Sequence, residues 1–287
     1  MISNRIHHPF VKDLAWLVEG HYIEQDFDLG LYWLSDIEER LLLLDSNPTL
    51  LISAVSACKS HFLGSYFETL FSFAIENLSS LTVLLEHFQI ENEGKTLGEV
   101  DMLVETPEGE LHQFEIAIKF YLERPDLYPH DWIGPNKNDS LLKKVTRARD
   151  HQLSILQTEA GLAAIEHVAK NRVPKSNLLI SGRLYSALKN QQNIISWLAQ
   201  NELGGWIRES DFTLLMSHFS HFYVLEKPYW MAFPEISDKF ILFSSQSAYN
   251  LVGKFLHDDR PKHVFLYHAL TEYKSINRSV FVVPDSW

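Results

Sequence analysis

Acidic side chains on two neighbouring predicted strands are the residues of this chain best suited to chemistry. The segment Gly-Glu-Val-Asp-Met-Leu-Val at 98–104 alternates polar and apolar residues, so Glu99 and Asp101 point to one face of a strand. After a Pro-Glu-Gly turn, Gln-Phe-Glu-Ile-Ala-Ile-Lys-Phe repeats the pattern and puts Glu115 and Lys119 on one face. The two strands therefore predict a hairpin whose polar face carries several acids and a lysine.

The turn decides which of these acids face each other. With a three-residue loop that ends in Gly109 in the left-handed conformation, Asp101 lies directly across from Glu115. Cross-strand Cβ atoms are about 5 Å apart, and like charges at that distance repel unless a proton or a cation lies between them. Because hard divalent cations prefer carboxylate oxygens, we expect Asp101 and Glu115 to bind Mg²⁺ or Mn²⁺.

A divalent ion at this position indicates phosphodiester chemistry. Such an ion lowers the pKa of a bound water and stabilises negative charge on a phosphate. Lys119 would orient that water or help to deprotonate it, and its charge would stabilise the transition state. Glu68, on a predicted helix upstream, borders the apolar face of that helix, so its carboxylate needs a partner. We therefore expect Glu68 to lie beside a polar or charged group.

These residues, in this order, resemble the PD-(D/E)xK nuclease superfamily over roughly residues 60 to 160. The resemblance includes Gly64-Ser65-Tyr66-Phe67-Glu68 and both strands. It implies a restriction-endonuclease-like α/β core, in which a mixed central sheet is flanked by helices. It also implies catalytic residues Glu68, Asp101, Glu115 and Lys119, metal ligands Glu68, Asp101 and Glu115, and a basic helix that binds nucleic acid through Lys143, Lys144, Arg147 and Gln152.

The spacing on the second strand departs from the superfamily pattern. One residue normally separates the acid from the lysine, whereas three do so here, and Ala117 occupies the expected acid position. Glu115 and Lys119 are thus about 13 Å apart along a strand instead of about 6.6 Å. A β-bulge could restore the site, and Glu99 could replace the missing acid because it could neighbour Ala117. The alternative is a degenerate nuclease fold that binds nucleic acid or a protein without cleavage.

A second resemblance concerns the whole chain and supplies no activity. The segments Trp132-Ile133-Gly134-Pro135, Gly182-Arg183-Leu184-Tyr185 and Pro228-Tyr229-Trp230 are similar to marks of a bacterial family known only as a domain of unknown function. A third possibility for function is accordingly a structural or interaction protein, in which the C-terminal part does the work.

The composition of the chain limits which folds, partners and cellular compartments are compatible with it. A chain of 287 residues with 46% apolar residues can build one large α/β domain, or a core with an appendage. Its formal charge of −12 argues against non-specific coating of nucleic acid, although a local basic groove is compatible with it. One cysteine excludes an intramolecular disulfide and a cysteine-rich zinc site. With no apolar run of about 20 residues and no signal sequence, we expect a cytoplasmic protein.

Periodicity and turn residues predict helices first, then a mixed core, then a strand-rich tail. Helices are predicted at Phe10–Val18, Asp36–Leu44, Thr49–Asn77, Asp139–Thr158 and Asn193–Gln200. Strands are predicted as a pair within Leu97–Tyr121 and at Asn177–Ile180, Phe212–Met216, Phe222–Leu225, Phe240–Phe243, His263–Tyr267 and Ser279–Val283. We place the division between the helical N-terminus with its α/β core, 1–190, and a C-terminal extension, 191–287, near residue 190.

Overall fold

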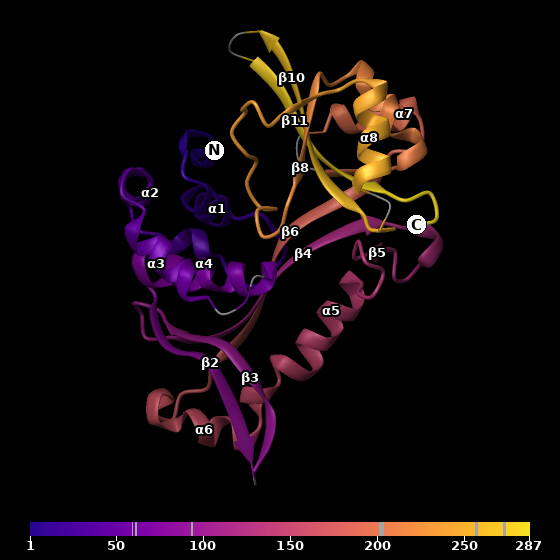
Figure 1. The fold of residues 1–287 in the computed structure, drawn as a ribbon. Coiled ribbons are helices and arrows are strands. Elements are labelled where there is room, and N and C mark those ends of the chain that lie inside the picture. The colour runs from indigo at the N-terminus through magenta and orange to yellow at the C-terminus, as the bar shows by residue number, and fades with distance from the viewer. Residues whose placement is uncertain (59, 61, 93, 201–203, 256–257, 272–273) are drawn as a thin grey trace. The chain divides into compact units, whose positions relative to one another are not determined.

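Two compact units make up the chain in the computed structural model, which describes all residues except 59, 61, 93, 201–203, 256–257 and 272–273 (Figure 1). Unit 1 comprises residues 1–119 and 143–182, and unit 2 comprises residues 120–142 and 183–287. Both units combine helices with strands, so the α/β class is confirmed. The division is not a single cut, because residues 120–142 belong with the C-terminal segment.

The N-terminal helices of unit 1 pack on one another. They are α1 (Pro9–Val18), α2 (Ile37–Ser46), α3 (Thr49–Ala57) and α4 (Leu63–Leu78). The prediction of one helix over Thr49–Asn77 is wrong. The backbone is extended at Cys58 and at Phe62, so it breaks the sequence into α3 and α4. The apolar face of α4 is buried against the rest of unit 1, and this positions Glu68 along the same helix.

The sheet of unit 1 holds the predicted hairpin near its edge. Its strands follow the order β2 (Thr82–Asn92), β3 (Lys95–Glu105), β4 (Leu111–Glu123) and β6 (Lys175–Ala187), and β1 (Tyr22–Gln25) pairs with β6. Strand β2 is absent from the elements predicted from the sequence, which include none between Asn77 and Leu97. His87, with φ of 47°, interrupts the alternation that would identify the strand.

The predicted register of the hairpin is confirmed. Glu105 pairs with Leu111 and Met102 pairs with Phe114. Gly109 has φ of 84° and closes the three-residue loop in the left-handed conformation. The ladder ends at Met102 and Phe114, the pair that comes directly before Asp101 and Glu115.

Helices lie on both faces of this sheet. The ring of Phe114 contacts Phe71 of α4, while the side chain of the preceding residue, Gln113, bonds to the main chain of Gln152. Because successive strand residues point to opposite faces, these two contacts belong to opposite sides of the sheet. Helix α6 (Glu159–Ala169) contributes to an apolar cluster with residues of β2, β3 and β4.

The basic segment before α6 is not one continuous helix. An α-helix, α5 (Leu141–Arg147), is followed by a π-helical turn at Ala148–Gln152 and a short 3₁₀ turn at Ile155–Gln157. Thr158 then caps α6, because its Oγ1 accepts from the backbone N–H of Gly161 at 3.0 Å. The prediction of a helix over Asp139–Thr158 is therefore confirmed from Leu141 to Gln152, where α5 continues as the π-helical turn, and only a short 3₁₀ turn follows.

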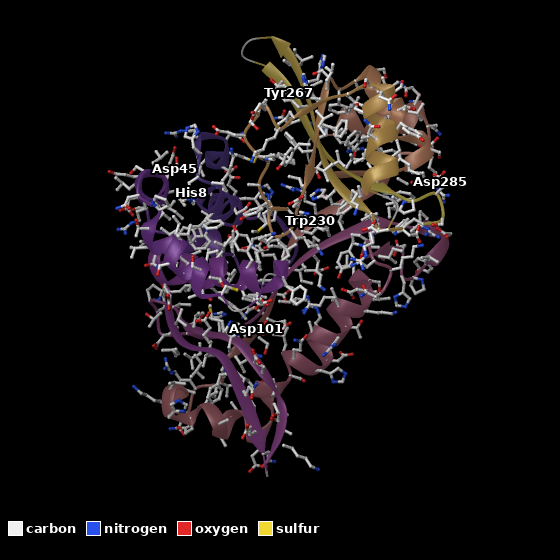
Figure 2. The ribbon with its side chains drawn as sticks, viewed as in Figure 1. His8, Asp45, Asp101, Trp230, Tyr267 and Asp285 are labelled. Atoms are coloured by element: carbon white, nitrogen blue, oxygen red, sulfur yellow. The ribbon has the colours of Figure 1, made fainter. Side chains whose placement is uncertain are left out.

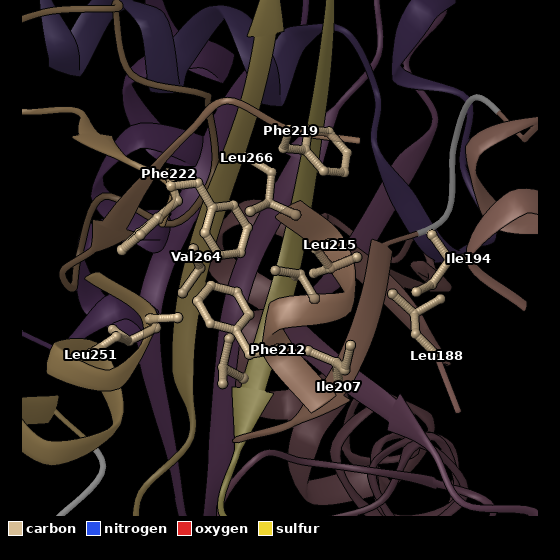
Figure 3. Close-up of a cluster of buried hydrophobic side chains, with 14 of the residues drawn as sticks. Leu188, Ile194, Ile207, Phe212, Leu215, Phe219, Phe222, Leu251, Val264 and Leu266 are labelled. Carbon is tan, nitrogen blue, oxygen red and sulfur yellow. The ribbon is translucent and has the colours of Figure 1, made fainter. Parts of the chain in front are cut away.

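Unit 2 contains the predicted strand-rich part. Its strands include β5 (Trp132–Ile133), β7 (Gly204–Arg208), β8 (His221–Leu225), β9 (Ile241–Leu242), β10 (Lys262–Thr271) and β11 (Lys274–Val283), in the sheet order β7-β11-β10-β8-β9. Helices α7 (Gln191–Leu198) and α8 (Ser245–Phe255) and a 3₁₀ segment, Glu209–Ser217, complete the unit. Its core is a cluster of buried aromatic and aliphatic side chains (Figure 3).

One of the strands predicted in unit 2 is a helix. Phe212–Met216 lies inside the 3₁₀ segment Glu209–Ser217, where Phe212 and Leu215 are both fully buried. Side chains three residues apart lie on the same side of a 3₁₀ helix, so this helix can bury both Phe212 and Leu215. The sequence prediction relies instead on the aromatic and aliphatic composition, which is typical of a strand. Within the described part of the chain, no helix combines the length and apolarity needed to cross a bilayer.

Candidate functional site

Asp101 and Glu115, hereafter the acid pair, lie together where β3 and β4 separate. The paired ladder ends at Met102 and Phe114, and the carboxylate of Asp101 (Figure 2) then accepts from the backbone N–H of Ile116 at 3.0 Å. Only 3% of the Glu115 side chain is exposed. The predicted acid pair is thus present, and it is largely withdrawn from water.

Lys144 of α5 contacts the acid pair. Its Nζ donates to Glu115 Oε1 at 2.7 Å, and the lysine side chain is 15% exposed. Its ammonium also lies 3.5 Å from Gln152 Oε1. Residues 144 and 152 are about two helical turns apart, so both reach the same point from one side of their segment.

Gln113 connects this segment to the strand. Its Nε2 donates to the main-chain carbonyl of Gln152 at 3.1 Å, and only 1% of its surface is exposed. Gln113 is not among the site residues predicted from the sequence. Its position two residues before Glu115, however, already places both side chains on the same strand face. The π-helical turn that carries Gln152 is a feature often found at functional sites.

Glu68 of α4 belongs to the electrostatic environment of the acid pair. Burial raises its pKa, as do the negative charges of Glu99 and Glu115. The positive charges of His87 and Lys144 act in the opposite direction and lower it. The charges of Glu68 and the acid pair therefore act on one another.

Glu99 has a partner of its own. It is exposed on β3, and its Oε1 lies 3.2 Å from Nδ1 of His87. His87 is the left-handed residue of β2, on the neighbouring strand. The carboxylate of Glu99 is thus engaged by His87. This contact competes with a role for Glu99 as the replacement acid beside Ala117.

Lys119 lies four residues beyond Glu115 on β4 and is half-buried. Its main-chain carbonyl packs against Gly182 of β6, where a Cβ atom would come within 1.7 Å of the carbonyl oxygen. Gly182 also has φ of 147°. The first residue of Gly182-Arg183-Leu184-Tyr185 is therefore a glycine because a side chain would not fit there and because the backbone angle favours glycine.

The helix that brings Lys144 to Glu115, α5, also carries exposed basic residues. Lys143 and Arg147 are both exposed. Arg149, in the π-helical turn, is engaged by Asp26 through two hydrogen bonds of 2.9 and 3.1 Å. Lys143 and Arg147 are therefore the predicted groove residues that a phosphate backbone could reach.

Burial and mutual repulsion shift the pKa values of the acid pair upwards. The pKa of Glu115 rises to about 7, mainly because burial disfavours its charged form, and then because of the charge of Asp101. Lys144 opposes both effects. Burial also raises the pKa of Asp101, while the N–H of Ile116 counteracts this rise. Near neutral pH, the pair can thus hold one proton between its two carboxyl groups.

A measurable pH dependence of stability follows for Glu115. Since its folded pKa lies above the ordinary glutamate value, its contribution to stability is complete below about pH 4.5 and is lost as the pH rises through 7. Glu115→Gln lacks this titration. We expect the unfolding free energy of the variant, relative to the parent, to increase by about 2 kcal/mol between pH 5 and pH 8. Urea unfolding at both pH values measures this, and a difference independent of pH would contradict it.

The residues present fit a magnesium ion held by few protein ligands. Among the described residues, no three His, Cys, Asp or Glu side chains converge as a metal cage. Mg²⁺, however, keeps several waters and is usually bound through one or two carboxylates and substrate phosphates. Asp101 and Glu115 supply such a pair, and Glu68 adds negative charge nearby.

A polar cluster in unit 2 pairs a serine hydroxyl with a histidine but is closed to solvent. Nε2 of His263 lies 2.8 Å from Ser279 Oγ and 2.9 Å from the hydroxyl of Tyr185. His263 and Tyr185 are fully buried, and burial holds the pKa of His263 well below its usual range. The cluster therefore satisfies buried polar groups and offers no access to a substrate.

Comparison with known proteins gives a family and no activity. A family profile described as "Domain of unknown function (DUF1853)" matches residues 12–283. No curated protein and no solved structure matches the chain significantly.

Proposed function

The chain belongs to the family described as Domain of unknown function (DUF1853), and from its own residues we propose that it is a metal-dependent phosphodiesterase acting on DNA or RNA. The observation that carries this proposal is the buried acid pair with a lysine ammonium 2.7 Å from one of its oxygens. We further propose that unit 1 has a restriction-endonuclease-like core. The confirmed hairpin register and the nearby Glu68 support that assignment.

Each residue has a definite task in this proposal. Asp101 and Glu115 would hold Mg²⁺ or Mn²⁺, which supplies an acidified water and positive charge opposite the phosphate. The N–H of Ile116 fixes the carboxylate of Asp101, so that ligand is oriented before the ion binds. Exposed Lys143 and Arg147 would contact the backbone phosphates of a nucleic acid strand. Lys119 is the lysine that the strand pattern assigns to the reaction.

Cleavage assays test the phosphodiesterase directly. Labelled single- and double-stranded DNA and RNA are incubated with the protein in Mg²⁺ or Mn²⁺, beside Asp101→Ala and Lys119→Ala. We expect wild type to cleave at least one substrate and Asp101→Ala to lose at least about 100-fold in rate, because a metal ligand is gone. Equal activity in all three proteins would identify a contaminating nuclease and remove the catalytic claim.

A second candidate function is binding without cleavage. The contact between Lys144 and Glu115 favours it, because the ammonium already neutralises a carboxylate that a metal would require. Fluorescence anisotropy with labelled nucleic acid in EDTA measures such binding. Binding that weakens in Arg147→Ala, together with no cleavage in any metal, would support this candidate. Cleavage that depends on Asp101 would exclude it.

A further inference from the structure

The strongest unexplained feature of the acid pair is the lysine that contacts it. Lys144 comes from α5, whereas the superfamily pattern would take the lysine from the strand that carries Glu115. Lys119, the lysine of that strand, lies about 13 Å further along it. Resting on the proposed function, we propose that Lys144 supplies the lysine of this centre and that Gln152 and Gln113 hold it there.

The geometry at the acid pair gives Lys144 the required position. Its ammonium is 2.7 Å from Glu115 Oε1, and its charge acts on all three nearby carboxylates, those of Glu68, Asp101 and Glu115. A group at this point can donate to an oxygen of a phosphate that lies against the acid pair. Lys144 therefore satisfies the requirement for a cation next to both the metal ligands and the reacting phosphate.

Gln152 and Gln113 are positioning residues in this proposal. Gln152 Oε1 lies 3.5 Å from the ammonium of Lys144. Gln113 then fixes the main chain of Gln152 through a 3.1 Å hydrogen bond. A flexible lysine side chain thereby has two contacts near the acid pair, one to Glu115 and one to Gln152, before any ligand arrives.

The extra residues between Glu115 and Lys119 acquire a physical explanation. If the lysine comes from α5, the second strand needs to supply only the acid. The strand then no longer needs an acid at Ala117 or a catalytic lysine at Lys119, and the superfamily spacing does not apply to these two positions. In this arrangement the backbone of Lys119 contributes to packing, through its carbonyl against Gly182.

Three methionine variants separate the lysines. Lys144→Met is compared with Lys119→Met and with Lys95→Met, an exposed lysine at the start of β3 that has no part in the proposed site. Cleavage and the calorimetric affinity for Mn²⁺ are both measured. We expect Lys144→Met to lose about 100-fold in cleavage and to bind Mn²⁺ at least as tightly as wild type, because a competing cation is gone. Lys119→Met should lose at least about tenfold less cleavage than Lys144→Met, and Lys95→Met should stay within about fivefold of wild type in both measurements.

Chemical restoration of the amine at residue 144 distinguishes loss of the ammonium group from loss of the fold. Lys144→Cys in a Cys58→Ser background carries a single thiol, since Cys58 is the one native cysteine. Alkylation of that thiol with 2-bromoethylamine gives an amine side chain of the same length as lysine, with sulfur in place of one methylene. We expect alkylation to restore cleavage at least about tenfold over the unmodified variant. A role of residue 144 in packing alone predicts no such restoration.

The outcomes distinguish this inference from the proposed function. Cleavage that survives in Lys144→Met and disappears in Lys119→Met overturns the assignment of Lys144 and leaves the phosphodiesterase standing. Wild type that binds Mn²⁺ without cleaving, with affinity raised only in Lys144→Met, overturns the activity and keeps Lys144 at the metal site. No Mn²⁺ binding in any variant overturns both.

Discussion

Lys144→Met is expected to lower the free energy of unfolding by about 3 kcal/mol at pH 8, and by much less at pH 5. The variant leaves the buried carboxylate of Glu115 without its 2.7 Å partner, close to the charge of Asp101. At pH 5 the raised pKa of Glu115 keeps that carboxyl protonated, so the loss of the ammonium removes little. The stability lost by this substitution therefore grows as the pH rises through 7.

Urea unfolding of wild type and Lys144→Met at pH 5, 6.5 and 8 measures this effect. Lys143→Met is the matched control, because exposed charges contribute at most about 1 kcal/mol. The same loss of stability at all three pH values would mean that Lys144 acts through packing of its methylene groups. It would contradict the electrostatic account of the acid pair.

Gly182→Ala is expected to have the largest effect of any small substitution in unit 1. Its new Cβ would lie 1.7 Å from the carbonyl oxygen of Lys119, well inside the contact distance of the two atoms. The φ of 147° also belongs to a region that only glycine adopts without strain. Because β4 and β6 would have to separate, we expect a loss of about 4 kcal/mol or more, or failure to fold.

Gly253→Ala is the control for the glycine prediction. Gly253 lies on α8, and no atom of the described residues comes within 4 Å of the place that a Cβ would take. Alanine also favours helices by about 1 kcal/mol over glycine. Thermal unfolding of both variants separates the two cases. A Gly182→Ala protein within about 1 kcal/mol of wild type would contradict the close approach of the two strands.

The hairpin is predictable because its signals are local. Alternation over Glu99–Met102 and the glycine of the turn predict the register of the hairpin, and the observed ladder has that register up to Met102 and Phe114. Glu68 is predictable in the same way, from its place on an apolar helix. These residues need no knowledge of how distant elements pack.

The partner of Glu115 is not predictable from local pattern. Lys144 is 29 residues from Glu115, and its contact depends on how α5 and the π-helical turn lie across β4. Sequence spacing favours Lys119, which shares the strand, over a lysine brought by tertiary packing. Strand β2 is not predicted for a different reason. The left-handed backbone of His87 interrupts the alternation of polar and apolar side chains by which a strand is recognised.

The central claim is that the acid pair binds a divalent metal, and Mn²⁺ calorimetry at pH 8 tests it most directly. At this pH both carboxyl groups of wild type are available to a metal, since the pKa of Glu115 is about 7. We expect wild type to bind Mn²⁺ at one site and Asp101→Asn to lose at least about tenfold in affinity. Identical isotherms for the two proteins, or no heat of binding to wild type, would contradict the account.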